Sequence, residues 1–206
     1  MQLLVIGCGG HARTVLDTAK VLGHSILGLI DVDFSGQDET ILGVRVLGGM
    51  EVLTKVSQSE VKLFVAIGDN QQRQKLTQEL VGNGFEIATL IHPTAIISES
   101  AMVEAGAIVC AGAIINPVAK IGAGSIVNTG SIVDHESQIG EFVHVSPGSS
   151  IAGRVSVGTQ TFVGIGTSVI DQISIGKNVV IGAGSVVIKD IDDNAKVVGV
   201  SKSISS

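Results

Sequence analysis

One spacing constrains the fold of this chain more than any other feature of its sequence. Every sixth residue from Ile97 to Val187 is Ile or Val, over sixteen positions without a slip. A mostly small or β-branched residue follows each of them by four positions, and Gly or Asn often follows by three. A period of six fits neither an α-helix, which repeats every 3.6 residues, nor a strand that alternates every two.

The sixfold period predicts a parallel β-helix, a coil of short strands that turns at fixed intervals. The aliphatic and the small residue point inward, and Gly or Asn takes the corner with positive φ. Three hexads per triangular coil give about 18 residues, hence about five coils stacked ~4.8 Å apart. The alternative is an all-β sandwich, but sandwich strands have no reason to keep one phase over 91 residues.

The composition suits such a thin-layered core and excludes several kinds of partner. The 206 residues are 45% apolar yet include no Trp, no Tyr and five Phe, as a core of Ile, Val and Ala layers requires. A net charge of −6 without a basic cluster argues against nucleic acid and anionic membranes. The two cysteines suit a reducing cytosol, and we find no signal peptide or membrane-spanning run. We therefore expect a soluble cytoplasmic protein.

Residues 1–91 alternate between strand and helix patterns, which predicts a small parallel α/β domain with half of a Rossmann fold. His92-Pro93 is a natural boundary, because the residue before Pro avoids the helical region. The β-helix domain then occupies residues 92–206. The expected strands are 2–6, 25–30, 42–47 (or a hairpin arm) and 61–67, and the expected helices are 14–22, 50–56 and 71–81.

The first candidate site is the Gly-rich turn GCGGHAR at residues 7–13, between a strand and a helix. It matches G-x-G-x-x-A, whose free N–H groups at a helix start bind phosphate. Asp31 ends the next strand, where a dinucleotide fold places its ribose-binding acid. An NAD site or an empty tight turn are alternatives, but 90 residues supply only half a dinucleotide fold. His11 and Arg13 favour a nucleotide-linked substrate, since Arg can pair with phosphate.

The second candidate site is the polar interruption VDHESQ at residues 133–138. His135 and Glu136 stand at a corner and should project outward, and His144 follows half a coil later. A corner His beside a carboxylate can act as a general base at neutral pH. The alternative is a solvated surface His.

Further corner positions carry Phe142, Arg154 and Gln160 where Gly is usual. These predict lateral packing between subunits, and for Arg154 a rim salt bridge in preference to a phosphate contact. No His/Cys/Asp cluster has the spacing of metal ligands, so we expect no metal.

Four segments carry a resemblance to a known family: GCGGHAR at 7–13, AIGDN at 66–70, IHPTAIIS at 91–98 and IVNTGSIVDHESQIGEFVHVSPGSSIAG at 126–153. Together they resemble the hexapeptide acyltransferases of bacterial surface-sugar synthesis. Nearest are the nucleotide-4-amino-sugar N-acetyltransferases of the bacillosamine (PglD-like) and perosamine pathways, with the sialic-acid O-acetyltransferases (NeuD-like) as relatives. The resemblance implies a homotrimer of left-handed β-helices with acetyl-CoA between neighbouring subunits.

The same resemblance implies roles for individual residues. His135 would be the general base and Glu136 would orient it, while the Gly153 N–H would meet the thioester oxygen. His144, Ile165 and Ala183 match acetyl-CoA positions. The matches to nucleotide-sugar contacts are Gly9, Gly10, His11, Asp31 and Gly68, with Asn128 near the sugar.

The expected activity is direct, acetyl-CoA-dependent N-acetylation of a UDP-linked 4-amino-sugar. The same fold could instead O-acetylate a sialic acid, and a non-catalytic trimeric nucleotide-binding scaffold is an alternative of another class. The family tail usually reads G-x-P-A-K, whereas residues 199–202 read GVSK. The missing Pro puts in doubt the tail's contacts with CoA.

Overall fold

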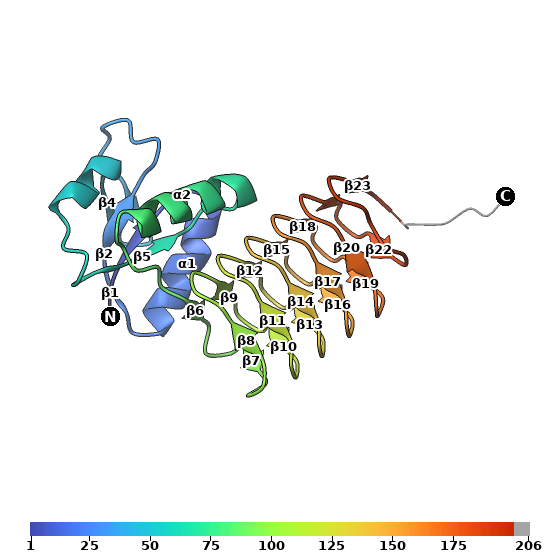
Figure 1. The fold of residues 1–206 in the computed structure, drawn as a ribbon. Helices are drawn as coiled ribbons and strands as arrows, with labels where there is room; N and C mark the ends of the chain where they lie inside the picture. Colours follow the sequence, from blue (N-terminus) through green and yellow to red (C-terminus); the bar gives the residue numbers. More distant parts are fainter. Residues whose placement is uncertain (200–206) are drawn as a thin grey trace. The chain divides into compact units, whose positions relative to one another are not determined.

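The computed structural model describes residues 1–199, and its contacts divide the chain into two compact units. The first unit runs from Met1 to His92, and the second begins at Pro93. Figure 1 shows an α/β unit and a stack of short strands. No helix of the described residues is long and apolar enough to cross a bilayer. The predicted loose tail, residues 201–206, and positions 200–202 of the family motif lie outside the described residues.

The first unit contains a five-stranded sheet in the order β3-β4-β2-β1-β5. The pairs β4-β2, β2-β1 and β1-β5 are parallel, and β3 pairs with β4 in antiparallel orientation. Because β1 lies between β2 and β5, the chain reverses its direction of winding there, and ligands bind at such points in open α/β sheets. The strands of this sheet are β1 (Gln2–Ile6), β2 (Ser25–Ile30), β3 (Thr40–Ile41), β4 (Val44–Gly48) and β5 (Lys62–Val65), and the short strand β6 (Leu90–Ile91) is not part of it.

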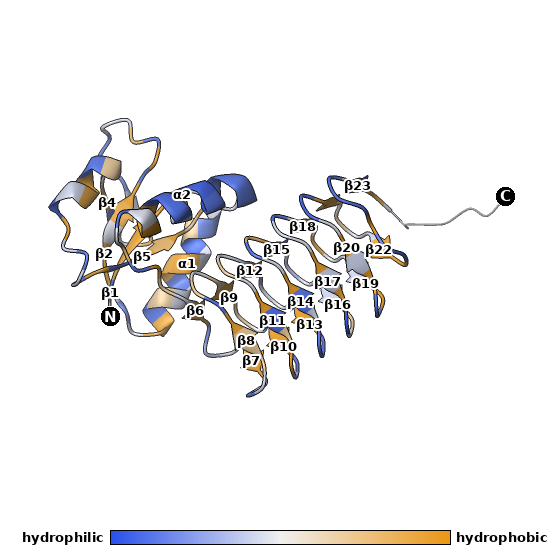
Figure 2. Ribbon diagram, viewed as in Figure 1, coloured by the Kyte–Doolittle hydropathy of each residue, from blue (hydrophilic) through white to orange (hydrophobic). Residues whose placement is uncertain are grey.

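Two α-helices and one 3₁₀ helix belong to this unit: α1 (Gly10–Val21), α2 (Asn70–Gly82) and η1 (Met50–Lys55). Helix α1 starts earlier than the predicted 14–22, because Gly9 is extended and serves as its N-cap. The expected helix at 50–56 is a 3₁₀ turn. Asp69 caps α2 by accepting the Gln72 N–H at 2.8 Å. Figure 2 shows hydrophobic sheet strands and a hydrophilic α2.

The second unit is a parallel β-helix, as the spacing predicts. Each two-residue strand pairs with the strands one coil away, for example Ile114 with Ile96 and with Ile132. The pairing step is therefore three hexads, the length expected for one coil. The strands form three faces. Face 1 contains β7 (Ile96–Ile97), β10 (Ile114–Ile115), β13 (Ile132–Val133), β16 (Ser150–Ile151), β19 (Ser168–Val169) and β22 (Val186–Val187).

Faces 2 and 3 follow face 1 in every coil. Face 2 contains β8 (Met102–Val103), β11 (Lys120–Ile121), β14 (Gln138–Ile139), β17 (Ser156–Val157) and β20 (Ser174–Ile175). In the second unit, face 3 contains β9 (Ile108–Val109), β12 (Ile126–Val127), β15 (His144–Val145), β18 (Phe162–Val163), β21 (Val180–Ile181) and β23 (Lys196–Val197). We call the corner between faces 1 and 2 corner A, that between faces 2 and 3 corner B, and that between faces 3 and 1 corner C.

The core of the β-helix is built from the two inward classes of residue that the sequence predicts. The sixfold Ile and Val side chains from Val109 to Val187 are almost completely buried. The small class includes buried hydroxyls whose hydrogen bonds are satisfied by carbonyls of neighbouring turns. Ser125 Oγ donates to Gly140 O at 2.8 Å, and Ser137 Oγ to Ala152 O at 2.8 Å. Such bonds remove the cost of burying a polar group.

The corners differ from the prediction that Gly or Asn takes the positive φ. Corner C follows it, with Gly at 112, 130, 148, 166 and 184. Corner A instead holds larger side chains in the left-handed region on successive coils, and corner B is mixed. The corner A residues are Val118, Glu136, Arg154 and Gln172, with φ between 57° and 65°.

The regular period ends after Val187, as the sequence indicates. The last pairings span less than three full hexads, since Val180 pairs with Lys196 and Ile175 with Ile191. The last coil is therefore shorter than the others, but β23 still pairs with β21 on face 3.

Candidate active site

A cavity of about 660 Å³ lies in the first unit where β1, β2 and β5 end. Five of the six predicted nucleotide-sugar residues of this unit line it, and Arg13 does not. The cavity therefore coincides with the point where the sheet reverses its winding. Its lining residues are Gly7, Cys8, Gly9, Gly10, His11, Asp31, Val32, Asp33, Met50, Ala66, Ile67, Gly68, Gln72, Lys75, Leu76 and Glu79.

The Gly-rich turn forms one wall of this cavity. Gly7 has φ +113°, and a Cβ there would lie 3.0 Å from Ala66 O, so only glycine fits without strain. Gly9 and Gly10 would direct a Cβ into open space. Helix α1 starts at Gly10 and points the N–H groups of its first turn, which favour an anion, toward the cavity.

The Arg13 side chain, for which we expect a phosphate contact, bonds its own loop in this structure. Its Nη1 donates to Cys8 O at 3.3 Å and to Gly9 O at 3.0 Å. The side chain thus folds back along the first turn of α1 and ties the Gly-rich loop to the helix. Its charge still contributes to the potential at the turn.

The opposite wall of the cavity comes from α2, which motif-based reasoning did not identify. Gln72, Lys75, Leu76 and Glu79 recur at the spacing of one helical face, the signal that could have found them. Arg73, 2% exposed, supports the loop before this helix.

The Arg73 guanidinium donates to Ile67 O at 2.9 Å, to Gly68 O at 3.1 Å and to Asn70 Oδ1 at 2.7 Å. Burial lowers the pKa of Arg73 to about 10, so it remains charged at neutral pH. These bonds hold Gly68 in the cavity wall.

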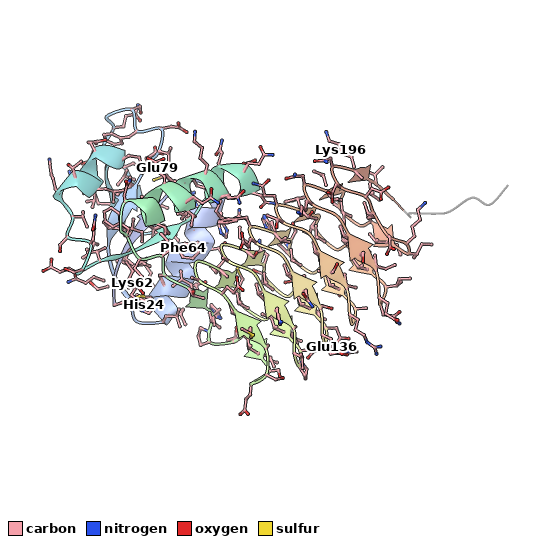
Figure 3. All side chains as sticks on the ribbon, viewed as in Figure 1. His24, Lys62, Phe64, Glu79, Glu136 and Lys196 are labelled. Carbon is pink, nitrogen blue, oxygen red and sulfur yellow. The ribbon has the colours of Figure 1, made fainter. Side chains whose placement is uncertain are left out.

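The second site lies at corner A of the β-helix. His135 Nδ1 is 3.1 Å from Glu136 Oε2, and about half of each side chain is exposed. Figure 3 shows Glu136 projecting from the edge of the coils. Gly153, one coil further, lies against the imidazole, because a Cβ built on it would be 2.5 Å from His135 Cε1 and Nε2. With Nδ1 facing the carboxylate, Nε2 is the nitrogen that can accept a proton.

The backbone of His135 is fixed by Asp134. The His135 N–H donates to Asp134 Oδ1 at 2.7 Å, and Asn116 Nδ2 donates to the same oxygen at 2.8 Å. The backbone N–H of His135, and then the Asn116 amide, lower the pKa of Asp134, so it stays ionised. Asp134 and Asn116 thus fix the backbone position of His135, and Glu136 orients its ring.

The predicted acetyl-CoA residues gather near corner C instead. His144 on β15 lies 3.1 Å (Nε2) from Asn128 Nδ2 and packs edge-on against Phe162, with ring centroids 5.2 Å apart. Asn128 Oδ1 accepts the Thr129 N–H at 2.8 Å, which turns its amide nitrogen toward His144. We infer that His144 Nε2 accepts this bond, so the neutral ring carries its proton on Nδ1.

Ile165 and Ala183 occupy corner C on successive coils, where the Gly184 N–H donates to Ile165 O at 2.8 Å. Both are exposed. The structure therefore brings together His135, Glu136 and Gly153 at corner A, and His144 with Asn128 on face 3 and corner C. One face of the coil, about one hexad or roughly 15–20 Å, separates the two corners.

Neither cysteine is poised to accept an acetyl group. Burial, with smaller contributions from Asp31 and Glu39, raises the pKa of Cys8 to about 11, and burial raises that of Cys110 to about 12. The nucleophilic thiolate is therefore scarce at pH 8. Within the described residues, no group of three or more His, Cys, Asp or Glu could hold a metal ion.

We expect Ellman's reagent at pH 8 to label Cys8 roughly 100-fold more slowly in the native protein than after unfolding, because two pKa units remove about 99% of the thiolate. A Cys110→Ala variant isolates the signal of Cys8. Equal native and unfolded rates would contradict the raised pKa.

Comparisons with known proteins bear on both units. Residues 2–80 match the family model described as the PglD N-terminal domain. A variant of perosamine N-acetyltransferase from Caulobacter crescentus, solved with CoA and GDP-perosamine, superposes with a TM-score of 0.92. It is 38% identical, and the match covers 97% of this chain and 94% of that one.

Two further relatives are also named as acetyltransferases. The acetyltransferase domain of PglB from Neisseria gonorrhoeae, solved with acetyl coenzyme A, has a TM-score of 0.90 and 34% identity, covering 96% of each chain. UDP-N-acetylbacillosamine N-acetyltransferase from Bacillus subtilis is 36% identical over 116 residues, 53% of this chain. The chain spans about half the length of that curated relative, 51%. The resemblance seen in the sequence is confirmed: the chain belongs to the PglD-like family of hexapeptide-repeat sugar acetyltransferases.

Proposed function

We propose that the protein transfers an acetyl group from acetyl-CoA to the amine of a UDP-linked 4-amino-sugar in bacterial surface-glycan synthesis. The observation that carries this is the His135–Glu136 pair, whose Nδ1 to Oε2 distance of 3.1 Å leaves Nε2 to take a proton. The cavity beside the Gly-rich turn supports a nucleotide-linked acceptor. Structures of relatives with CoA and GDP-perosamine, or with acetyl coenzyme A, support the reaction class.

In the proposed mechanism the neutral sugar amine attacks the thioester carbonyl, and His135 Nε2 takes the proton that the nitrogen loses. A C–N bond forms, the C–S bond breaks, and CoA leaves as a thiolate that is protonated to the thiol. The Gly153 N–H would stabilise the oxyanion of the tetrahedral intermediate. Glu136 would stabilise the imidazolium. No acetyl-enzyme is needed, in keeping with the raised pKa values of both cysteines.

The separation of corners A and C supports a homotrimer with shared sites. Acetyl-CoA residues of one protomer, His144, Ile165 and Ala183, would face the His135 of its neighbour across the groove between them. A single coil cannot bring its own two corners together, because a strand lies between them. We expect sedimentation to give about three times the chain mass of 21.0 kDa.

The place of action follows from the proposed substrates. Acetyl-CoA and nucleotide sugars are made inside the cell, so we propose that the enzyme works in the cytoplasm. The two cysteines, both unpaired, support a reducing compartment.

Replacing His11 with alanine is expected to raise KM for the nucleotide sugar roughly 10-fold or more with little change in kcat. His11 lines the cavity beside the α1 N-terminus, and a hydrogen bond to a charged group contributes about 1.5–3 kcal/mol. Steady-state kinetics at a saturating concentration of acetyl-CoA measure this KM. His24→Ala is the matched control, and an unchanged KM in the His11 variant would remove the residue from the nucleotide site.

The function is tested by a panel of UDP-, GDP- and CMP-linked sugars assayed for thiol release from acetyl-CoA. A UDP-4-amino-sugar should give the highest kcat/KM and a product stable to hydroxylamine, as an amide is. A preference for GDP would change the nucleotide assignment. An ester product, lost in hydroxylamine, would indicate O-acetylation, and absence of acetyl-CoA binding by calorimetry would indicate a non-catalytic scaffold.

A further inference from the structure

At the corner position with positive φ, corner A carries residues with side chains, whereas the described coils have glycine at this position of corner C. Val118, Glu136, Arg154 and Gln172 succeed one another there with φ between 57° and 65°. This left-handed region is unfavourable for residues with a Cβ. Backbone bonds hold it in place, for the Arg154 N–H donates to His135 O and the Gln172 N–H to Gly153 O, at 2.9 and 3.0 Å. A strained backbone that is retained beside a reactive group points to a role for the side chains it presents.

Arg154 and His135 both contact the same oxygen of Glu136. Arg154 Nε lies 3.4 Å from Glu136 Oε2, and His135 Nδ1 lies 3.1 Å from the same atom. Arg154, Glu136 and His135 therefore form a chain that joins two successive coils. The stacking of corner A, one coil upon the next, places the guanidinium beside the carboxylate of the coil before.

We propose that Arg154 is a positioning residue for the general base, acting through Glu136. Its guanidinium holds Oε2 toward His135 Nδ1, which keeps Nε2 turned outward as the proton acceptor. Its positive charge offsets part of the negative field that Glu136 exerts on the imidazole. This inference rests on the proposed function only in calling His135 a base; the geometry of the network is independent of it.

The charged groups around the His135 ring decide whether losing Arg154 favours or disfavours its protonated form. Glu136 contacts Nδ1, Asp134 accepts the backbone N–H of His135, and Arg154 contacts Glu136. From the next coil, Gly153 presents backbone to the ring. Two negative charges therefore favour the imidazolium and one positive charge opposes it. Removing Arg154 should make the imidazolium easier to form, and a base must be deprotonated to work.

Arg154→Gln is the test, because Gln172 shows that corner A accepts glutamine at φ 60°. We expect the NMR titration midpoint of the His135 ring, measured without substrate, to move to higher pH in this variant, because the positive charge beside Glu136 is lost. The acidic limb of kcat/KM against pH should move upward by the same amount. With the carboxylate less constrained, kcat at high pH should fall about 3- to 10-fold while KM stays constant. Arg154→Lys, which keeps the charge, should restore the midpoint.

Arg45→Gln is the matched control, since Arg45 forms an exposed ion pair with Asp38 at 3.2 Å in the first unit. This variant should leave unchanged the titration midpoint of His135, the acidic limb of the kcat/KM profile and kcat itself. An unshifted His135 midpoint in Arg154→Gln, with unchanged Tm, would overturn the inference even if the wild type is fully active. A wild type without acetyltransferase activity would overturn the proposed function instead, and the ring titration would still report on the network.

Discussion

Replacing His135 with alanine is expected to lower kcat by about 10²–10⁴-fold, the usual contribution of a general base. Without the imidazole, Nε2 is no longer present to take the proton of the amine, and Glu136 loses the ring that it orients. The amine would then lose its proton to solvent. KM for both substrates and the mass of the assembly in sedimentation should change little, because about half of the His135 side chain is exposed. Thiol release at saturating acetyl-CoA measures kcat.

His24→Ala provides the matched control, as the same change at a half-buried His outside both candidate sites. It should keep wild-type kcat. Full activity in His135→Ala with an unchanged mass in sedimentation would remove the base assignment, and with it the mechanism. Partial rescue by added imidazole would support it.

Replacing Gly153 with alanine is expected to lower kcat by about 10²-fold or more. The added Cβ would lie 2.5 Å from His135 Cε1 and Nε2, so the ring must leave its position, and an error of about 1 Å in a catalytic group can cost this much. Alanine keeps the backbone N–H, so the loss would come from the displaced imidazole and not from a missing oxyanion donor. Kinetics and the His135 ring signals in NMR spectra report the two effects separately.

A double-mutant cycle with His135→Ala isolates the clash. Once the ring is gone the Cβ has room, so Gly153→Ala should add little further loss in Tm or kcat. Gly82→Ala, at the end of α2 with open space around its Cβ, is the benign control. Additive effects of the two changes in the cycle would contradict contact between residues 135 and 153.

The β-helix could be predicted almost entirely from sequence because its order is one-dimensional. Each coil contacts only its neighbours, so a repeat along the chain becomes the repeat of the structure. Val133 and Ile151 illustrate this, since they stand three hexads apart in the sequence and pair directly. The same reasoning located the end of the regular coils after Val187.

The corners and the cavity could be predicted only in part. The sequence marks glycine as the residue for positive φ, yet Val118 and Arg154 adopt it because ladder hydrogen bonds and inward packing fix the backbone. The turn at residues 7–13 predicts a phosphate site, but Arg13 bonds its own loop. The wall from α2, with Lys75 and Glu79, depends on how that helix packs on the sheet.

The amino-acid sequence by itself determined the β-helix, its period, the α/β unit before it and the family, because each rests on local spacing or on short motifs. Only the tertiary structure decided that Glu136 Oε2 is shared by His135 and Arg154, and that Gly153 leaves room for the imidazole. The contacts of Arg154 with Glu136 and of Gly153 with His135 join residues of successive coils through space. Their geometry depends on stacking at corner A, where side-chain directions follow from φ values that no local sequence preference would select.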